Sequence, residues 1–290
     1  MNRRFEKLIA AGELCRIKIS LFAAVAAVAG FLVSPEGGPS FARLAGLAAG
    51  VLFLSCGASA FNQIAEAATD SLMPRTRTRP IPSGRLKRGH ALLISTVLIL
   101  AGAFVLFLSG GALPAALGAA AFLWYGLVYT PLKRKTPFAL IPGALAGAVP
   151  PAIGWACGGG SLLGPRILAF CFFFYIWQIP HFWLFLLKYG REYEKAGLPT
   201  VTRVFSSAGL RRIIFAWEIC AAASAMLLAV FDPAGRLSGV LFALPAAWMI
   251  GSGAAVLSGK NGRYQFALRS IDACALAITC LLGAGRFIAA

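Results

Sequence analysis

The sequence has few charged residues and very few acidic ones. Asp, Glu, Lys and Arg make up only 13% of the 290 residues, against roughly 25% in a typical soluble domain. Hydrophobic residues account for 59%, and the mean hydropathy is +0.78. This scarcity of charge argues against a soluble enzyme or a soluble binding domain and indicates an integral membrane protein.

Three other features are missing. The seven cysteines show no paired CxxC spacing and most lie inside apolar runs, so we interpret them as packing residues rather than disulfides or metal ligands. The N-terminal segment contains Glu6 and Glu13 and has no short apolar stretch ending in a cleavage site, which argues against a signal or transit peptide. No polar stretch has room for a soluble domain, so residues 1–290 are expected to form a single polytopic membrane domain.

Long apolar windows recur along the whole chain. A hydrocarbon core about 30 Å thick needs about 20 apolar residues per helix, and windows of that size predict an all-α protein with nine transmembrane helices. The second helix is expected to continue beyond the lipid to about Asp70. The predicted spans are 16–33, 41–65, 89–108, 112–130, 138–157, 165–188, 210–231, 237–257 and 267–288.

Basic residues are abundant, with 27 Lys and Arg against 10 Asp and Glu and a net charge of +17. In a soluble protein this excess would suggest nucleic acid as a partner. Here 23 of the 27 fall on one predicted side of the membrane, and the positive-inside rule then places the N-terminus in the cytoplasm and the C-terminus outside. Membrane orientation therefore explains most of the charge, and no nucleic-acid partner is expected. The basic segments are the N-terminus through Lys18 and residues 71–90, 131–137, 188–212 and 258–269.

A polar stripe marks the end of the second predicted helix. Asn62, Glu66 and Asp70 are spaced by four residues, which places them along one face of a helix. Two carboxylates on adjacent turns repel each other, and Mg²⁺ is a hard cation that takes one or two carboxylates together with substrate phosphate oxygens. The pattern predicts a magnesium site, whereas a purely structural interpretation pairs the two carboxylates with Arg75 or Arg77.

Basic side chains near this stripe suit a phosphate group. Arginine guanidinium groups form planar forks that match phosphate oxygens, and lysines add point charges. Any one of these residues alone is an ordinary positive-inside signal, but the group beside two carboxylates favours a metal and diphosphate site. The predicted diphosphate-binding residues are Arg75, Arg77, Arg79, Lys133, Arg134 and Lys135.

Three segments then resemble a known family. Residues 62–80, NQIAEAATDSLMPRTRTRP, are similar to the Asp-rich first motif of the UbiA superfamily of intramembrane prenyltransferases, and their ending resembles the protoheme IX farnesyltransferase family within it. Residues 129–155, YTPLKRKTPFALIPGALAGAVPPAIGW, and residues 177–199, WQIPHFWLFLLKYGREYEKAGLP, match further family segments in the same order.

The sequence also departs from that pattern. Glu66 and Glu192 stand where the family has Asp, and Ala68 stands where another Asp is common. After Pro199 the family continues Met-Leu-Pro-Val, whereas residues 200–203 here are Thr-Val-Thr-Arg.

The resemblance implies nine helices around a central cavity and transfer of a farnesyl group from farnesyl diphosphate to a vinyl group of heme B, giving heme O. It implies Mg²⁺ held by Asn62, Glu66 and Asp70, and Glu192 as a further catalytic carboxylate near a second ion. His181 is either a packing histidine or, within the matching segment, a contact or axial ligand for the acceptor's iron. The other expected acceptor contacts are Tyr129, Trp177 and Tyr189.

Two other functions fit the same sequence. The first keeps the fold and transfers the prenyl group to an aromatic quinone precursor or another lipid acceptor. The second is a membrane transporter or a heme-binding assembly protein without catalysis. In each case the expected location is a bacterial inner membrane, with the site opening to the cytoplasm. The resemblance also fits partners in terminal-oxidase assembly or a homo-oligomer.

Overall fold

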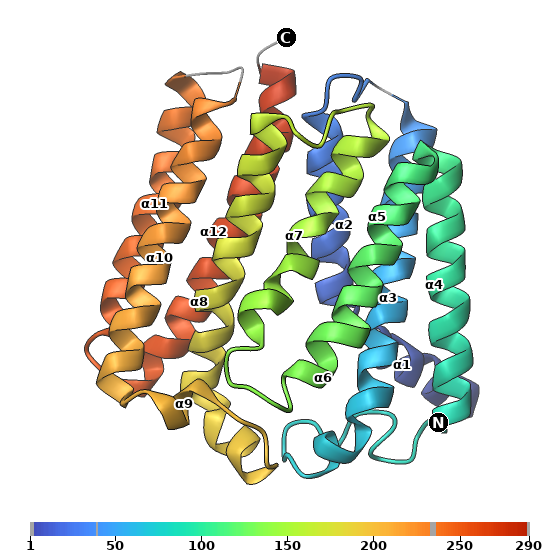
Figure 1. Ribbon diagram of the computed structural model, residues 1–290, viewed down its shortest axis with the longest axis vertical. Coiled ribbons are helices and arrows are strands. Elements are labelled where there is room, and N and C mark those ends of the chain that lie inside the picture. Colours follow the sequence, from blue (N-terminus) through green and yellow to red (C-terminus); the bar gives the residue numbers. More distant parts are fainter. Residues whose placement is uncertain (1–2, 39, 233–235, 289–290) are drawn as a thin grey trace.

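The computed structural model describes residues 3–38, 40–232 and 236–288, and this part of the chain is helical without any strand (Figure 1). The all-α prediction is therefore confirmed, while residues 1–2 and 289–290 of the predicted single domain lie outside the described residues. The elements are α1 Arg3–Cys15, α2 Ile17–Leu32, α3 Phe41–Ser71, α4 Arg88–Gly110, α5 Ala112–Leu123, the π-helix η1 Trp124–Tyr129, α6 Thr130–Leu132, α7 Leu140–Cys157, α8 Pro165–Lys195, α9 Val201–Val204, α10 Ser207–Val230, α11 Arg236–Val256 and α12 Asn261–Ile288.

The number of helices that can cross a membrane agrees with the sequence. Within the described residues, eight helices are long and apolar enough to span it, and the bent pair formed by α1 and α2 brings the number to nine. As predicted, α3 continues past the apolar window and ends at Ser71, one residue beyond Asp70. α8 runs further than its predicted span, to Lys195.

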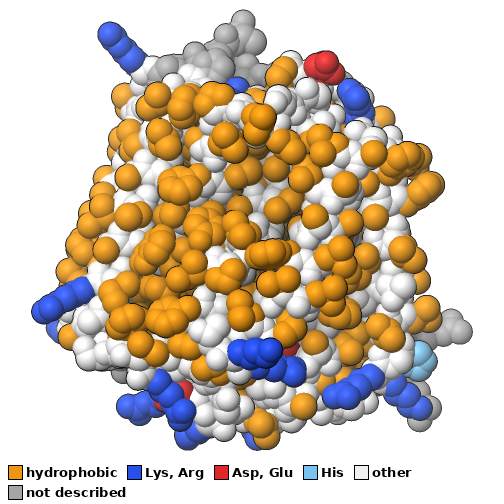
Figure 2. All heavy atoms as spheres, viewed as in Figure 1, with side chains coloured by type: hydrophobic (Ala, Val, Ile, Leu, Met, Phe, Trp, Pro, Cys, Tyr) orange, Lys and Arg blue, Asp and Glu red, His pale blue; other side chains and the backbone are white. Residues whose placement is uncertain are grey.

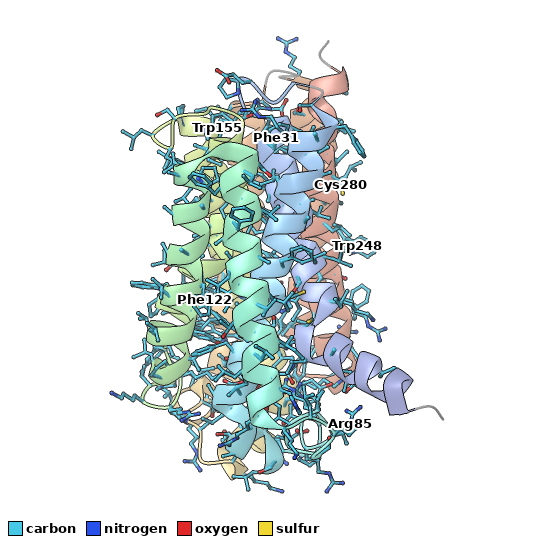
Figure 3. All side chains as sticks on the ribbon, turned by 90° about the vertical axis from the view of Figure 1, so that its right-hand side faces the viewer. Phe31, Arg85, Phe122, Trp155, Trp248 and Cys280 are labelled. Carbon is cyan, nitrogen blue, oxygen red and sulfur yellow. The ribbon has the colours of Figure 1, made fainter. Side chains whose placement is uncertain are left out.

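The chain bends sharply at Arg16, between α1 and α2. Arg16 has a φ of 47°, in the left-handed region that is unusual for a residue with a side chain, and the two helices meet at 50°. α1 consequently leaves the bundle at its lower edge instead of extending α2 (Figure 3). The Gln63 side chain of α3 donates hydrogen bonds to the carbonyls of Glu13 and Leu14, at 3.0 and 2.9 Å, and ties the end of α1 to the bundle.

Close helix contacts depend on small residues. α3 and α4 pack along most of their length, and a Cβ atom at Gly102 would lie 2.6 Å from the Leu54 backbone nitrogen and 2.8 Å from the Gly50 carbonyl oxygen. At the next contact, the Ser95 hydroxyl donates to the Gly57 carbonyl at 2.8 Å. This is the packing expected where lipid supplies no hydrophobic driving force between helices.

One span changes its helical winding before it ends. η1 is a single π-helical segment between α5 and α6, and such segments often occur at functional sites. The Thr130 hydroxyl donates to the Tyr125 carbonyl at 2.8 Å and satisfies a backbone group at this wide turn. The prolines Pro150, Pro151 and Pro180 lie inside α7 and α8, and both helices continue through them.

The surface has the character of a membrane protein. Hydrophobic side chains cover the middle of the face seen in Figure 2, and Lys and Arg gather along its lower edge. Large apolar residues such as Leu100, Leu108 and Val230 are well exposed, as lipid-facing side chains are. All seven cysteines are free; Cys56, Cys157 and Cys274 are buried among packed side chains, whereas Cys220 and Cys280 are exposed.

Candidate active site

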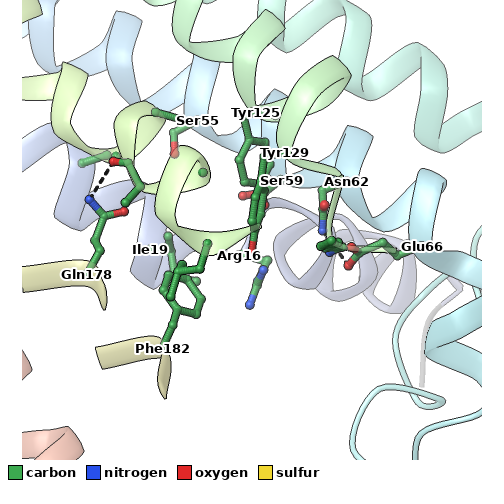
Figure 4. Close-up of a pocket in the computed structure, with 18 of the residues that line it drawn as sticks. Arg16, Ile19, Ser55, Ser59, Asn62, Glu66, Tyr125, Tyr129, Gln178 and Phe182 are labelled. Carbon is green, nitrogen blue, oxygen red and sulfur yellow. Dashed lines mark hydrogen bonds and ion pairs between the residues drawn. The ribbon is translucent and has the colours of Figure 1, made fainter. Parts of the chain in front are cut away.

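A cavity of about 480 Å³ lies inside the bundle among α2, α3, η1, α7 and α8. This volume is in the range of small-molecule and cofactor sites. Polar and charged side chains surround one end and apolar side chains the other. In Figure 4, Asn62 and Glu66 line one side, Gln178 and Phe182 of α8 the opposite side, and Tyr125 and Tyr129 stand between them.

The polar stripe of α3 lies in the mouth of this cavity, as its spacing predicts. Asn62 Nδ2 donates to Glu66 Oε2 at 2.9 Å, and Asn62 Oδ1 lies 3.2 Å from the Thr130 hydroxyl oxygen. Asp70 is 1% exposed, and its Oδ2 lies 2.6 Å from Arg79 Nη1. Glu66 forms an ion pair with Lys133. The ionic partners of Glu66 and Asp70 are thus Lys133 and Arg79. The purely structural interpretation of the sequence, which paired these carboxylates with Arg75 or Arg77, is wrong.

Five cationic side chains line the mouth. Four of them are among the predicted diphosphate-binding residues, and the fifth, Arg16, enters from the bend before α2 (Figure 4). Arg77 and Lys135 are not part of the cavity lining. The other four lining cations are Arg75, Arg79, Lys133 and Arg134.

Neighbouring groups hold Arg75 in position and lower the pKa of Lys133. The Arg75 guanidinium lies 4.8 Å from the ring centroid of Phe185 and 5.4 Å from that of Tyr189, and its Nη2 donates to the Tyr193 hydroxyl at 3.4 Å. These contacts from α8 hold a cation beside the α3 carboxylates. Burial, followed by the positive charges of Arg16 and Arg134, lowers the pKa of Lys133 to about 7, so its ammonium group holds its proton less firmly than that of an exposed lysine.

Away from the mouth, the cavity becomes apolar. From Asp70 to Val51, the lining of α3 extends over 19 residues, roughly 28 Å at about 1.5 Å per residue. The rings of Tyr125 and Tyr129 stack at 5.5 Å between the polar and apolar parts. The site can therefore take an amphiphile with a compact anionic head and a long hydrocarbon tail. The apolar lining includes Ile19, Ala23, Leu54, Ala58, Leu106, Phe122, Ala144, Pro150 and Ile153.

The predicted acceptor residues separate into two groups. His181 and Tyr129 line the cavity. Trp177 is buried behind His181, with ring centroids 5.2 Å apart, and its indole N–H donates to the Ile271 carbonyl at 3.0 Å. Tyr189 is outside the lining and packs on Phe185 at 4.7 Å.

Glu192, the further catalytic carboxylate that the resemblance implies, lies outside the cavity lining. Glu192 belongs to the last turns of α8, and its Oε2 atom is buried without a hydrogen-bond partner. In the segment that departs from the family pattern, the hydroxyl groups of Thr200 and Thr202 both donate to Glu194, at 2.9 and 2.6 Å. That segment is therefore used locally to anchor the end of α8.

Several lining residues were not identified from the sequence. Gln178 Nε2 donates to the Ala144 carbonyl at 3.2 Å and joins α8 to α7 across the cavity. Arg16 belongs to the basic N-terminal segment that membrane orientation explains, and neither Tyr125 nor Phe122 is among the predicted site residues. Their positions on single helices do not identify them as site residues, because the cavity forms only when seven separate elements, α2, α3, α4, α5, η1, α7 and α8, come together.

The donor atoms of the mouth suit Mg²⁺. In the described part of the chain, no group of three or more His, Cys, Asp or Glu side chains is arranged to hold a metal ion. Two carboxylates and one amide oxygen do line the mouth on successive turns of α3, however, and Mg²⁺ usually combines such a small protein set with water and phosphate oxygens. Asn62, Glu66 and Asp70 therefore fit a magnesium ion that arrives with a diphosphate.

Comparison with known proteins identifies relatives across most of the chain. The model of the UbiA prenyltransferase family matches residues 23–276. A protoheme IX farnesyltransferase from Geobacter sulfurreducens is 41% identical over 233 residues, covering 80% of this chain and 85% of that protein. Another from Oleidesulfovibrio alaskensis is 40% identical over 193 residues, covering 66% of this chain and 67% of that protein.

Solved structures show the same fold. A UbiA homolog from Aeropyrum pernix K1 in its apo form superposes with a TM-score of 0.73 at 23% identity, covering 94% of this chain and 98% of that one. A UbiA homolog from Archaeoglobus fulgidus bound to GPP and Mg²⁺ gives a TM-score of 0.70 at 16% identity, covering 97% and 99%. The fold prediction is thereby confirmed.

Proposed function

The chain belongs to the UbiA prenyltransferase family, and on that basis we propose that it transfers a farnesyl group from farnesyl diphosphate to a vinyl group of protoheme IX, giving heme O. The relatives at 36–41% identity that carry the name protoheme IX farnesyltransferase support the choice of both substrates.

The amphiphilic cavity is the observation that carries the proposal. Its mouth holds five cations and two carboxylates, and its interior is lined by aliphatic and aromatic side chains. A prenyl diphosphate has the same two parts. Arg16, Arg75, Arg79 and Arg134 bind the diphosphate oxygens, and the hydrocarbon chain lies along α3 toward Val51.

Departure of the diphosphate is the step that needs most electrostatic help. The bond between C1 of the farnesyl chain and oxygen breaks, and its electron pair leaves with the diphosphate. Asn62, Glu66 and Asp70 would hold Mg²⁺, which supplies charge neutralisation on the leaving group when it is bound. The fixed cations of the mouth stabilise the same developing charge without having to reorganise.

The cavity walls protect the allylic cation that remains. The stacked rings of Tyr125 and Tyr129 present electron-rich faces to a positive charge, and the aliphatic lining excludes bulk water. The vinyl carbon of the acceptor attacks C1. Water then adds to the new cation beside the porphyrin and loses a proton, which leaves a hydroxyethylfarnesyl side chain.

The acceptor binds on the α8 side of the cavity. His181 contacts the iron of the porphyrin there, since imidazole is a suitable ligand for iron, with Tyr129 beside it and Trp177 supporting its ring. Tyr189 acts through Arg75, and Glu192 supplies a further carboxylate near the mouth. Arg77 and Lys135 approach the diphosphate only from the surrounding loops.

We place the protein in the bacterial inner membrane, with the mouth of the cavity facing the cytoplasm. The positive-inside pattern supports this orientation. Partners in terminal-oxidase assembly or a second copy of the chain fit the same location.

Product analysis tests the function. Purified protein in detergent receives farnesyl diphosphate, heme B and Mg²⁺, and mass spectrometry detects heme O. Removal of Mg²⁺ with EDTA should stop diphosphate release. Glu66→Gln should lower it by about 100-fold or more, the size of effect typical when a preorganised electrostatic group is lost.

The control is Glu36→Gln, which removes an exposed carboxylate in the loop between α2 and α3 and should leave the rate unchanged. Prenylation of an aromatic quinone precursor without any heme O would replace the proposed acceptor.

A further inference from the structure

His181 is held from outside the cavity by a residue that belongs to none of the motifs. Its Nδ1 atom lies 2.6 Å from Asp272 Oδ1 on α12, 91 positions further along the chain. His181 lines the cavity, whereas Asp272 does not. Asp272 thus reaches the site only through the imidazole ring, from the helix that packs on the far side of α8 (Figure 1).

Asp272 is an unusual residue for its position. It lies within the apolar span Gly262–Gly285, and its side chain is 46% exposed. A carboxylate in a membrane span is costly and generally has a partner and a function. The partner of Asp272 in the described residues is the His181 ring, through the 2.6 Å contact at Nδ1.

α12 holds α8 at two successive turns. The indole N–H of Trp177 donates to the carbonyl of Ile271, and the next residue of α12, Asp272, bonds to His181 one turn further along α8. The Trp177 and Phe182 rings lie 5.2 and 5.1 Å from the His181 ring and restrict its rotation. The position of the imidazole is therefore set by two neighbouring rings and by the contact at Nδ1.

The carboxylate also selects the tautomer. An ionised carboxylate only accepts hydrogen bonds, so the proton of the imidazole lies on Nδ1 and the lone pair on Nε2. A histidine that donates its second N–H to a carboxylate is a more basic ligand with a fixed orientation. The ring atom left free by this arrangement is the one that binds iron.

We propose that Asp272 is a positioning residue for the acceptor: it fixes the tautomer and orientation of His181 so that Nε2 binds the iron of the porphyrin beside the prenyl cation. The inference rests on the proposed function, because it requires a heme acceptor. α12 contributes no residue to the cavity lining, yet through Asp272 it would determine how the acceptor is held.

The test measures heme binding and the iron–imidazole bond directly. Purified unaltered protein, Asp272→Asn and Asp272→Glu are titrated with heme B, and the ferrous complexes are examined by resonance Raman spectroscopy. Asp272→Asn keeps the side-chain shape but replaces the accepting carboxylate. It should weaken heme binding by about 10- to 100-fold, as loss of a partner behind a metal ligand does, and move the iron–imidazole stretching band to lower wavenumber.

Asp272→Glu keeps the carboxylate and should restore the band to near its original wavenumber. Glu36→Gln, which removes a carboxylate far from His181, should change neither quantity. The unaltered protein gives a further reading that needs no variant, because its band should lie above that of heme B bound to free imidazole in the same detergent.

The outcomes separate this inference from the proposed function. An Asp272→Asn variant that forms heme O and shows an unchanged band and affinity overturns the positioning role and leaves the function intact. The expected shifts without any heme O support the positioning role and count against the function. Absence of heme B binding by the unaltered protein overturns both.

Discussion

Replacing Gly102 with alanine is expected to destabilise the protein, because α3 and α4 touch through this residue. The new methyl group would lie 2.6 Å from the Leu54 nitrogen, where ordinary contacts begin at 3.4 Å. The neighbouring Gly50 carbonyl oxygen would be only 2.8 Å away. Since these atoms belong to the backbone, rotation of a side chain cannot relieve the overlap, and the two helices must move apart.

The magnitude follows from two opposing effects. Overpacking of this kind costs about 1–3 kcal/mol, and we expect the upper part of that range because the two nearest atoms belong to the rigid backbone of α3. Alanine recovers about 1 kcal/mol, since it is the better helix former. The net loss of about 1–2 kcal/mol corresponds to a fall in melting temperature of roughly 2–8 °C for a chain of this size.

The assay is thermal unfolding in detergent, with Gly251→Ala as the matched control. Gly251 is an exposed glycine in α11, and a Cβ atom there would meet nothing within 4 Å. The control should therefore unfold at the same or a higher temperature. If Gly102→Ala unfolds no earlier than Gly251→Ala, the close contact between α3 and α4 is not what the distances indicate.

Two other changes test contacts made by side chains of α3. Asp70→Asn should destabilise the fold by roughly 2–3 kcal/mol, which is less than the loss of a fully buried ion pair, because Arg79 is 18% exposed. In a denaturant titration, the Asp70→Asn, Arg79→Met double variant should recover part of that loss. A double variant that is no more stable than the single variant would contradict the pairing. Gln63→Leu should leave the carbonyls at the end of α1 without their donor, at a cost of about 1–3 kcal/mol. Amide hydrogen exchange should become faster in α1 and stay unchanged in α7. Equal protection of α1 in the unaltered protein and in the variant would show that Gln63 does not anchor this helix.

The sequence was sufficient for those parts of the site that lie on one helix. Asn62, Glu66 and Asp70 share a stripe because a spacing of four residues returns to the same face, and α3 carries them into the mouth as expected. The nine apolar windows likewise depend only on local composition. Both predictions use short-range geometry that the chain fixes by itself.

The partners of these residues were not predictable in the same way. Arg79 and Lys133 reach the carboxylates because the loop after α3 and the turn after α6 fold back over the mouth. Asp272 is paired with a histidine 91 positions away, a distance at which spacing carries no information. One signal was present, since an acidic residue in an apolar span is costly, and Asp272 could have been selected on that ground.

The bend at Arg16 affects the membrane itself. α2 has 16 residues and is therefore roughly 24 Å long, shorter than the hydrocarbon core of about 30 Å. The last turns of α1, bent by 50° from α2, would have to complete the span, and a span that is still short is accommodated by local thinning of the bilayer or by snorkelling of its flanking residues. Arg16 lies at the bend and also lines the mouth of the cavity, so the bend helps to set the depth at which a bound anionic group meets the surrounding lipid headgroups.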